Sequence, residues 1–496
     1  MGKFKMPTWL HGHPPPASDT QRKKNNRKSL SSSFTTNGKT SATLVVPELD
    51  DAASKQSSDI SSQMVLLARI ISEQTAKLEN YMRTHDLPSP GLTSGSPADF
   101  PRLPDDMQDA RMKIIFATKE LSALAHGPRE SVRWGVWGFL DVLSLQIINH
   151  YRIANLVPVD GEISYKDLQT KTTLDPINLA RIVRHAMTNY IFHEPKPGFV
   201  AHTAASRVLA EDPDLQDWIG FNSEDIFPSA GSTIDALKTH PEATSLTRSG
   251  FTFAFDTVDK ESMFATIGKE PVRAKRLAGA MASLTGGEGY EIHHFVNHVN
   301  LEEVDAAGGT FVDIGGSHGF MSVALAKKWK KMKFVVQDLQ KTIESAPTPI
   351  CEDADVAGRI ELQTHDFFTE QPVRGADVYF FRWIIHNYST PYAVKILKSL
   401  VPSLKPGARI LINDNCLRPV GAENPWDEKI TRGMDLIMLV LLNAQERDEE
   451  EFRKLFHEAD PRFEFKGVSR SEGCRMSVVE AVWNPKEAED DDEEEE

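Results

Sequence analysis

Apolar residues in the first 300 positions recur at intervals of three and four, the spacing of an amphipathic helix. In the segment Ile60–Tyr81, for example, Met64, Leu67 and Ile71 follow this spacing. The same pattern predicts a mainly helical region up to about residue 300. The predicted helices include Ile60–Tyr81, Asp105–Ala125, Ser131–Ala154, Met263–Thr285 and Tyr290–Val299.

One part of this region carries signals for two short helices followed by a β-hairpin. Ser164, with Asp167 three residues later, has the pattern of a capping box at the start of one helix. Asp175 before Pro176 supplies an N-cap and a proline at the first position of the next helix. The hairpin is predicted at Ile191–Val200, with prolines at its tip. Two helices followed by a wing predict a winged-helix fold.

DNA binding is the usual association of a winged helix, but the charge of this chain argues against it. The second helix offers few basic residues beyond Arg181 and Arg184, and the formal net charge of the chain is −15. Phosphate binding needs clustered positive charge. We therefore predict that the winged helix serves packing or dimerisation, and DNA binding remains as an alternative.

After residue 300, short apolar runs alternate with helical patterns. Alternating β and α units predict an α/β domain with a Rossmann-like, doubly wound parallel sheet, whose ligand binds at the carboxyl ends of the strands. The predicted strands are Thr310–Ile314, Lys333–Val336, Ile360–Gln363, Val378–Arg382 and Ala408–Asn413, with a late pair near Phe463–Val468 and Arg475–Trp483.

A glycine-rich turn follows the first of these strands, in the sequence F-V-D-I-G-G-S-H-G of Phe311–Gly319. Gly315 and Gly316 allow a backbone to approach a ligand closely. Asp338 follows the second strand, where an acidic side chain can accept hydrogen bonds from both hydroxyls of a ribose. This unit alone is compatible with NAD, FAD or S-adenosylmethionine.

Polar residues also follow the later strands. Asp366 and the adjacent Phe367 follow the third strand, and an acid beside an aromatic ring can bind the amino group and cover the face of an adenine. Arg382 ends the fourth strand, and His386 lies four residues later. Asp414 ends the fifth strand. These positions predict one shared site at the carboxyl edge of the sheet.

His386 is the candidate general base of that site, since a neutral imidazole accepts protons at physiological pH. A carboxylate on the second ring nitrogen would fix the tautomer and stabilise the imidazolium. Asp414 and Glu446 are both candidates for this carboxylate. Glu446 begins a charged run, Glu446–Glu451, which would ordinarily be a solvated face.

Composition adds limits to this picture. The chain has 496 residues, of which 40% are hydrophobic and 26% charged, which is ordinary for a soluble protein. Its three cysteines lack paired or metal-like spacing, and no His/Cys cluster suggests a metal site. There is no apolar signal-peptide region and no run of about 18 apolar residues. These features predict a cytoplasmic protein with no membrane span and no metal.

Six motifs in the second half occur together in the order and spacing of a known family. They are F-V-D-I-G-G-S-H-G, V-Q-D-L, T-H-D-F-F, F-R-W-I-I-H-N-Y-S, I-L-I-N-D-N and M-D-L-I-M-L-V-L-L-N-A-Q-E-R. Together they resemble the S-adenosylmethionine-dependent, cation-independent O-methyltransferases of the plant caffeic acid type. More closely, residues 130 to 484 resemble fungal polyketide-pathway O-methyltransferases of the sterigmatocystin 8-O-methyltransferase kind.

The resemblance implies a role for each candidate residue. It places the catalytic base at His386, the two flanking acids at Asp414 and Glu446, and a methionine beside the acceptor ring at Met281. It also implies a homodimer formed through the winged-helix domain. The implied contacts to S-adenosylmethionine are Gly315, Gly316, Asp338 (ribose), Asp366 and Phe367 (adenine), and Arg382.

Four residues depart from the family pattern. Ser317 stands where the family often has glycine, and Arg382 stands where plant members have lysine. Asn387 replaces the aspartate that follows the base in plant members, and Asp414 replaces glutamate, which shortens that side chain by one methylene. The last two changes concern how His386 is supported, not its identity.

Five segments follow from composition, pattern and resemblance. We predict a disordered polar tail at 1–58, a helical winged-helix-like dimerisation domain at 59–215 and a helical connecting, acceptor-binding region at 216–300. The Rossmann-like methyltransferase domain is predicted at 301–485, followed by an acidic disordered tail at 486–496.

The predicted function is transfer of a methyl group from S-adenosylmethionine to a phenolic or enolic hydroxyl of an aromatic secondary metabolite, with a fungal polyketide as the favoured class. Two other classes of protein remain as alternatives. One is a catalytically inactive, methyltransferase-like regulatory dimer, and the other is a winged-helix DNA-binding protein. The acceptor itself is not identified by the sequence.

Overall fold

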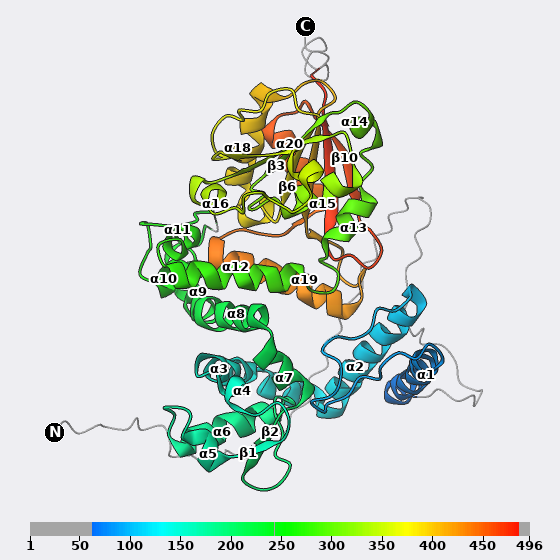
Figure 1. The fold of residues 1–496 in the computed structure, drawn as a ribbon, viewed down its shortest axis with the longest axis vertical. Helices are drawn as coiled ribbons and strands as arrows, with labels where there is room; N and C mark the ends of the chain where they lie inside the picture. Colours follow the sequence, from blue (N-terminus) through cyan, green and yellow to red (C-terminus); the bar gives the residue numbers. More distant parts are fainter. Residues whose placement is uncertain (1–61, 243, 486–496) are drawn as a thin grey trace, which may run out of the picture. The chain divides into compact units, whose positions relative to one another are not determined.

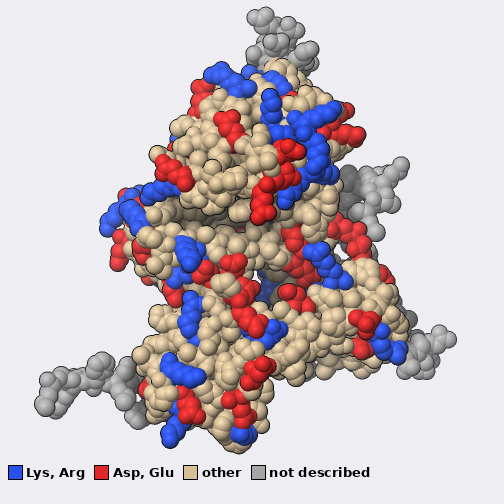
Figure 2. All heavy atoms as spheres, viewed as in Figure 1, with Lys and Arg blue, Asp and Glu red and all other residues tan. Residues whose placement is uncertain are grey.

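The computed structural model describes residues 62–242 and 244–485 (Figure 1). The tails predicted at 1–58 and 486–496 lie outside the described residues. Within the described ranges, no helix is long and apolar enough to cross a membrane. On the face drawn in Figure 2, basic and acidic side chains are intermixed, unlike the clustered positive charge that phosphate binding needs.

The first helices are α1 (Gln63–Thr84) and α2 (Asp105–Gly135), which pack against each other. The prediction ended one helix at Ala125 and began the next at Ser131, and the structure has a break between these positions, because the backbone of α2 is not helical at Gly127. At this break Gly127 adopts a φ of 74° and is followed by Pro128. Glycine tolerates a positive φ and proline removes a helical hydrogen bond, so these two residues divide α2 into two helical segments.

The predicted pair of short helices is present, together with two short strands. The elements are α3 (Gly138–His150), α4 (Ile153–Leu156), β1 (Glu162–Ser164), α5 (Tyr165–Gln169), α6 (Pro176–Met187) and β2 (Phe199–Ala201). Ser164 and Asp175 cap α5 and α6 as predicted, each accepting a backbone N–H of the first turn. The predicted hairpin is only partly formed: β2 pairs with β1, and its return strand is reduced to a bridge at His193. Pro195 and Pro197 have no N–H to donate to a ladder.

Helices continue up to the sheet. They are α7 (Ala204–Glu211), α8 (Pro213–Phe221), the π-helix η1 (Asn222–Ile226), α9 (Phe227–Thr239), α10 (Gly250–Ala254), α11 (Met263–Ile267), α12 (Pro271–Thr285), α13 (Ile292–His298) and α14 (Glu302–Ala306). The single helix predicted at Met263–Thr285 is wrong, because the structure forms α11 and α12 instead. Glu270 has the extended backbone that a residue before proline favours, so Pro271 starts a new helix.

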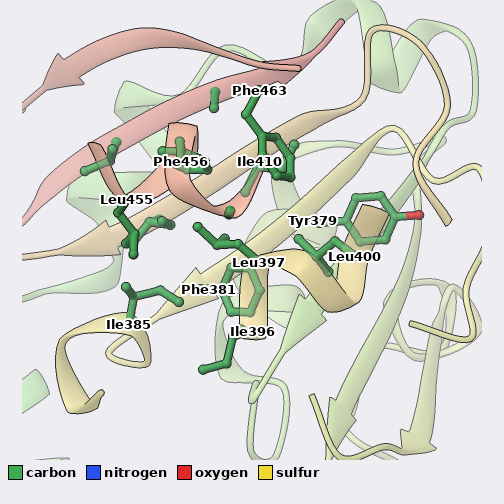
Figure 3. Close-up of a cluster of buried hydrophobic side chains, with 14 of the residues drawn as sticks. Tyr379, Phe381, Ile385, Ile396, Leu397, Leu400, Ile410, Leu455, Phe456 and Phe463 are labelled. Carbon is green, nitrogen blue, oxygen red and sulfur yellow. The ribbon is translucent and has the colours of Figure 1, made fainter. Parts of the chain in front are cut away.

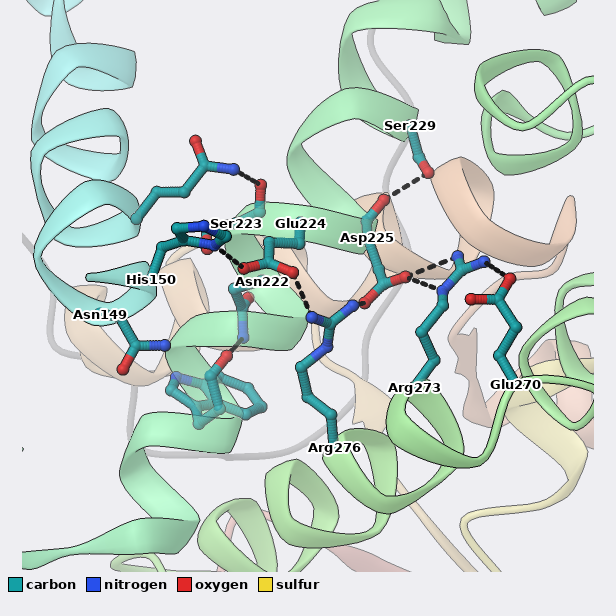
Figure 4. A network of polar contacts seen from close by, with 12 residues as sticks. Asn149, His150, Asn222, Ser223, Glu224, Asp225, Ser229, Glu270, Arg273 and Arg276 are labelled. Atoms are coloured by element: carbon teal, nitrogen blue, oxygen red, sulfur yellow. Dashed lines mark hydrogen bonds and ion pairs between the residues drawn. The ribbon is translucent and has the colours of Figure 1, made fainter. Parts of the chain in front are cut away.

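An ion-pair network ties η1 to α12 (Figure 4). The carboxylate of Asp225 is 1% exposed and accepts hydrogen bonds from Arg273 and Arg276, each at 2.7 Å. Arg276 also pairs with Glu224, and Arg273 with Glu270 at 3.0 Å. Because removing one partner of a buried ion pair leaves an uncompensated charge, this network fixes α12 firmly against η1.

The second half of the chain forms a seven-stranded sheet in the order β10-β11-β7-β6-β3-β4-β5. Its strands are β3 (Thr310–Ile314), β4 (Lys333–Asp338), β5 (Ile360–Thr364), β6 (Val378–Arg382), β7 (Arg409–Asp414), β10 (Phe463–Ser469) and β11 (Ser477–Trp483). β11 runs antiparallel to its two neighbours, and the other neighbours pair in parallel. The strand order reverses between β3 and β6, which is where doubly wound sheets bind ligands.

Alternate residues of each strand cover opposite faces of this sheet. Tyr379 and Phe381 point into a cluster with α18 and α20 (Figure 3), whereas Phe380 packs with α13 and α15 on the other face. The remaining elements are α15 (Phe320–Lys328), α16 (Gln340–Glu344), α17 (Ala354–Ala357), the 3₁₀ turn η2 (Ile385–Asn387), α18 (Thr390–Leu400), η3 (Val401–Ser403), β8 (Cys416–Leu417), α19 (Pro425–Leu442), β9 (Arg447–Asp448) and α20 (Glu449–Ala459). The predicted Rossmann-like fold is confirmed.

Candidate functional site

The glycine turn after β3 is held by the neighbouring strand. The backbone N–H groups of Gly315 and Gly316 both donate to the carbonyl oxygen of Gln337, at 2.8 and 3.1 Å. Gly315 has a φ of 72°, a conformation that strongly favours glycine. A Cβ on Gly315 would lie 2.6 Å from the Cδ1 of Ile384, and one on Gly316 would lie 2.6 Å from the carboxyl of Asp313. The turn therefore has no room for side chains at these two positions.

Ser317 occupies a left-handed position in this turn, with a φ of 51°. Its backbone N–H donates to Oδ2 of Asp338 at 3.0 Å, and the N–H of Leu339 donates to Oδ1 of the same carboxylate at 2.8 Å. The left-handed backbone explains why glycine suits this position. Asp338 is oriented by both contacts and stays partly exposed, so its remaining lone pairs face outward from the turn.

Asp366 and Phe367 lie on the same rim of the sheet. The Phe367 ring comes within 3.8 Å of the position that a Gly315 Cβ would occupy, and its centroid lies 5.7 Å from that of Tyr388. Asp366 is exposed, and its Oδ1 accepts the Phe368 N–H at 3.0 Å. Burial raises the pKa of Tyr388, and the nearby Asp366 and Asp338 carboxylates raise it further. The structure thus gathers these predicted residues around the glycine turn.

Arg382 is partly buried, and its guanidinium is hydrogen-bonded to other groups of the protein. One amino group donates to the carbonyl oxygen of Tyr290 at 2.7 Å, and the other bonds the side chain of Asn413. Burial lowers the pKa of Arg382 to about 10. Burial also raises the pKa of Asp313 to about 6, which the Ser322 hydroxyl at 2.7 Å and the Arg382 charge partly oppose.

His386 lies in η2, just beyond β6, and its side chain is 6% exposed. Its Nδ1 lies 2.9 Å from Oε1 of Glu446, whose side chain is 0% exposed. Burial alone would lower the pKa of His386, but the negative charges of Glu446 and Asp414 outweigh burial and raise it. With Nδ1 bound to Glu446, the remaining ring nitrogen, Nε2, is the one that is left to meet an acceptor.

Asp414 supports the backbone of His386, not its ring. Oδ2 of Asp414 accepts the backbone N–H of His386 at 3.0 Å, so the carboxylate orients the turn that carries the imidazole. Burial raises the pKa of Asp414. Of the two flanking acids predicted from sequence, the structure therefore gives the ring contact to Glu446 and the main-chain contact to Asp414.

Several residues near His386 carry contacts that the sequence did not indicate. Asn415 donates from Nδ2 to Oε1 of Glu446 at 3.1 Å, and the Trp383 ring centroid lies 5.1 Å from that of His386. The Tyr290 hydroxyl and the Trp383 ring N–H are buried without hydrogen-bond partners. Arg447 is 1% exposed although it lies in a charged run. Such a run indicates a solvated face, so only tertiary contacts reveal its burial.

Met281 lies on α12, outside the elements that carry the other predicted site residues. Its neighbour Ala280 is fully buried, but 37% of Met281 is exposed. Its carbonyl oxygen accepts the Thr285 hydroxyl at 2.9 Å. Its role beside an acceptor stays a prediction.

Comparison with known proteins gives this cluster a chemical context. Residues 256–461 match the family model described as an O-methyltransferase domain. The chlorophenol O-methyltransferase of Trichoderma longibrachiatum is 60% identical over 431 residues, which span 87% of this chain and 92% of that protein. The chain belongs to this O-methyltransferase family.

Other relatives of this methyltransferase are also fungal. O-methyltransferase gsfB of Penicillium aethiopicum is 36% identical over 86% of the chain and 99% of its own length. The grayanic acid biosynthesis cluster O-methyltransferase of Cladonia grayi is 33% identical over 86% of the chain and 88% of its own length. The predicted family and the predicted use of S-adenosylmethionine are confirmed, and the comparisons support an enzyme rather than the inactive regulatory dimer.

Solved structures share the fold of this methyltransferase at lower sequence identity. The crystal structure of OxaC has a TM-score of 0.68 and 23% identity, and the alignment covers 85% of this chain and 100% of that one. OxaC in complex with SAH and oxaline gives a TM-score of 0.67. At this identity the likeness establishes the fold, and the roles of individual residues rest on the geometry described above.

Proposed function

We propose that this enzyme methylates a phenolic hydroxyl of a small aromatic acceptor, with His386 as the general base. The observation that carries the proposal is the buried pair of His386 Nδ1 and Glu446 Oε1, 2.9 Å apart. A carboxylate at Nδ1 holds the tautomer whose Nε2 accepts a proton, and it stabilises the imidazolium that results. As the acceptor oxygen forms its bond to the methyl carbon, its proton passes to Nε2 of His386.

S-adenosylmethionine, when bound, would supply a sulfonium whose methyl group is open to in-line attack, with its bond to sulfur breaking to leave a neutral thioether. The residues of the rim fit this cofactor. The turn at Gly315 and Gly316 exposes only backbone to a ligand, because a Cβ there would meet Ile384 or Asp313. Asp338 presents an oriented carboxylate for two ribose hydroxyls. Asp366 and Phe367 offer an acceptor and an aromatic face for adenine. Arg382, bound to Tyr290 and Asn413, would contribute positive charge and support to the cofactor's methionine end.

The pKa of the acceptor's hydroxyl decides whether methyl transfer needs a general base. An unsubstituted phenol has a pKa near 10, so it is protonated at neutral pH and needs a base. The relative at 60% identity is named for chlorophenols, whose chlorine atoms withdraw electrons and make the hydroxyl more acidic. Trp383 and Tyr290 supply aromatic surface and unpaired polar atoms beside His386, and we assign them and Met281 to the acceptor side.

Labelled methyl transfer to a panel of acceptors tests this proposal. The panel contains phenol, mono- to trichlorophenols, hydroxyanthraquinones, hydroxyxanthones and an aliphatic alcohol of similar size. We expect O-methylation of at least one phenolic class and none of the aliphatic alcohol, whose hydroxyl is far less acidic. Methylation of the alcohol at a rate equal to that of the phenols would contradict the phenolic assignment. Comparing the rates for the chlorophenols with those for the larger polyketides shows which acceptor size the enzyme prefers.

The pH dependence of the reaction reports on the proposed base. Because Glu446 and Asp414 raise the pKa of His386, we expect kcat/KM to fall on the acid side with an inflection above pH 6.5. Below that pKa the imidazole is protonated and cannot accept the phenol proton. Glu446→Gln removes the largest raising charge, so its inflection should move to lower pH, whereas an inflection that stays in place would exclude His386 as the titrating group.

We further propose that the enzyme is a homodimer. The segment that joins α2 to α3 exposes a run of large apolar side chains: Val132 (73%), Trp134 (49%), Val136 (67%), Trp137 (56%) and Phe139 (46%). A contiguous exposed apolar stretch of this kind is typical of a protein–protein interface.

We also infer a reducing, cytoplasmic setting from the three free cysteines.

Light scattering coupled to gel filtration tests the dimer. We expect the wild-type chain to elute with twice its monomer mass of 55.4 kDa, and Trp137→Glu to shift it towards the monomer, because a charge at a buried interface is costly. Val420→Glu, on an exposed side chain of the methyltransferase domain, is the matched control. A monomeric wild type at micromolar concentration would contradict the proposal.

A further inference from the structure

Arg447 is a buried arginine that acts on the turn carrying His386. It is 1% exposed, and it is among the largest fully buried side chains in the described residues. Its Nη1 donates to the carbonyl oxygen of Ile385 at 3.1 Å, and its Nη2 donates to that of Tyr388 at 2.7 Å. These two carbonyls flank His386 in the sequence. The guanidinium therefore clamps both ends of η2.

The backbone brings this clamp and the ring partner of His386 to the site together. Glu446 and Arg447 are adjacent in sequence, and Arg447 pairs in β9 with Cys416 of β8, two residues beyond Asp414. Glu446 then reaches the imidazole, while Arg447 reaches the carbonyls on either side of it. A single two-residue segment thus fixes both the ring and the main chain of the base.

The charges around His386 give Arg447 a second effect. Two carboxylates contact His386: Glu446, after α19, at its ring, and Asp414, at the end of β7, at its backbone N–H. Asp435 of α19 accepts the backbone N–H of Glu446 at 2.9 Å. The rings of Trp383 and Tyr290 are neutral neighbours. Arg382 interacts with Asp414, and Arg447 interacts with both Asp414 and Glu446. The hydrogen bonds of Arg447 go to carbonyl oxygens, so its charge is not neutralised by a directly bonded carboxylate.

We propose that Arg447 is a positioning residue for methyl transfer, which holds the turn of His386 and offsets the negative charge of Glu446 and Asp414 beside it. This inference rests on the proposed role of His386 as the base. The positive charge of Arg447 lowers the pKa of His386, in opposition to the two carboxylates. Without Arg447, the two carboxylates would raise the pKa of His386 further, so a smaller fraction of the imidazole would be free to take a proton from the acceptor.

The test replaces the guanidinium and follows His386 directly. Titration of His386 is measured by NMR on the full chain with isotope-labelled histidine, and the signal is assigned with His386→Gln. In Arg447→Met we expect the pKa of His386 to rise by about one pH unit, and kcat at neutral pH to fall about tenfold and to recover at higher pH. KM for S-adenosylmethionine should remain as in the wild type, because Arg447 has no contact with the rim.

Arg359 offers a matched control. It also donates to backbone carbonyls, those of Trp329 at 2.8 Å and Met332 at 3.2 Å, at the far side of α15. Arg359→Met should lower the melting temperature and leave the titration of His386 in place. Arg359→Met therefore shows whether a loss of stability alone can shift the titration of His386.

The outcomes separate this inference from the proposed function. An unchanged His386 titration in Arg447→Met would overturn the charge effect of Arg447. A shifted titration without a matching shift in the pH–rate profile would support Arg447 but exclude His386 as the base. If the Met variant does not fold, Arg447→Lys keeps the charge: we expect a wild-type titration with reduced kcat, and full activity would overturn the clamp.

Discussion

His386→Gln is expected to lower the rate of methyl transfer about 10²–10⁴-fold, the usual contribution of a general base. The variant retains a polar side chain of similar reach but cannot accept a proton. Binding of S-adenosylmethionine should be unchanged, because the glycine turn and Asp338 do not contact His386. Single-turnover assays and a direct cofactor titration measure the two effects separately.

The acidity of the acceptor sharpens this test. A polychlorinated phenol already loses its proton near neutral pH, so the loss in His386→Gln should shrink as the acceptor becomes more acidic. A loss of equal size for all phenols would show that His386 acts in another way. His202→Gln is the matched control, since His202 is also buried and bonds Ser206 at 2.9 Å and the Val157 carbonyl at 3.1 Å, within another part of the fold.

Asp338→Ala is expected to weaken S-adenosylmethionine binding about 10–100-fold, because hydrogen bonds to a charged group contribute about 1.5–3 kcal/mol. The carboxylate is oriented by the backbone N–H groups of Ser317 at 3.0 Å and Leu339 at 2.8 Å. Calorimetric titration of the full chain measures the affinity. Once the cofactor is saturating, the rate of transfer should recover, since Asp338 lies apart from the proposed base.

Asp305→Ala separates this binding effect from a general loss of structure. The Asp305 carboxylate also accepts two backbone N–H groups, those of Lys331 at 2.7 Å and Met332 at 3.0 Å, but it lies at the other end of the sheet's strands. We expect it to lower stability and to leave cofactor affinity as in the wild type. Equal affinities in Asp338→Ala and the wild type would contradict the ribose assignment.

Much of the fold was predictable because the central strands of its sheet are buried. The strands Thr310–Ile314 and Val378–Arg382 have the predicted bounds, and β4 extends the predicted run only to Asp338. Buried parallel strands appear as continuous apolar runs, and glycine turns end them, so both signals are local. The helical half was predicted less closely: the segment Met263–Thr285 forms α11 and α12, and the return strand of the predicted hairpin is reduced to a bridge at His193.

The candidate site also has a part that the sequence predicted and a part that it did not. The order of motifs placed Gly315, Asp338 and His386 at strand ends, and parallel strands bring such ends to one edge. The relation between the two acids was not readable, since Asp414 and Glu446 had equal claims to the imidazole. The structure gives the ring to Glu446 and the backbone amide to Asp414.

The sequence by itself therefore determined the family and the sheet, and it placed the proposed base at a strand end, since each depends on residue types at fixed local spacing. Tertiary structure alone decided which acid contacts the imidazole and that Arg447 is buried behind it. Glu446 and Arg447 open a charged run that would be solvated on an isolated helix. They are buried because β9 pairs with β8 beneath the turn of His386, a long-range contact that no local pattern encodes.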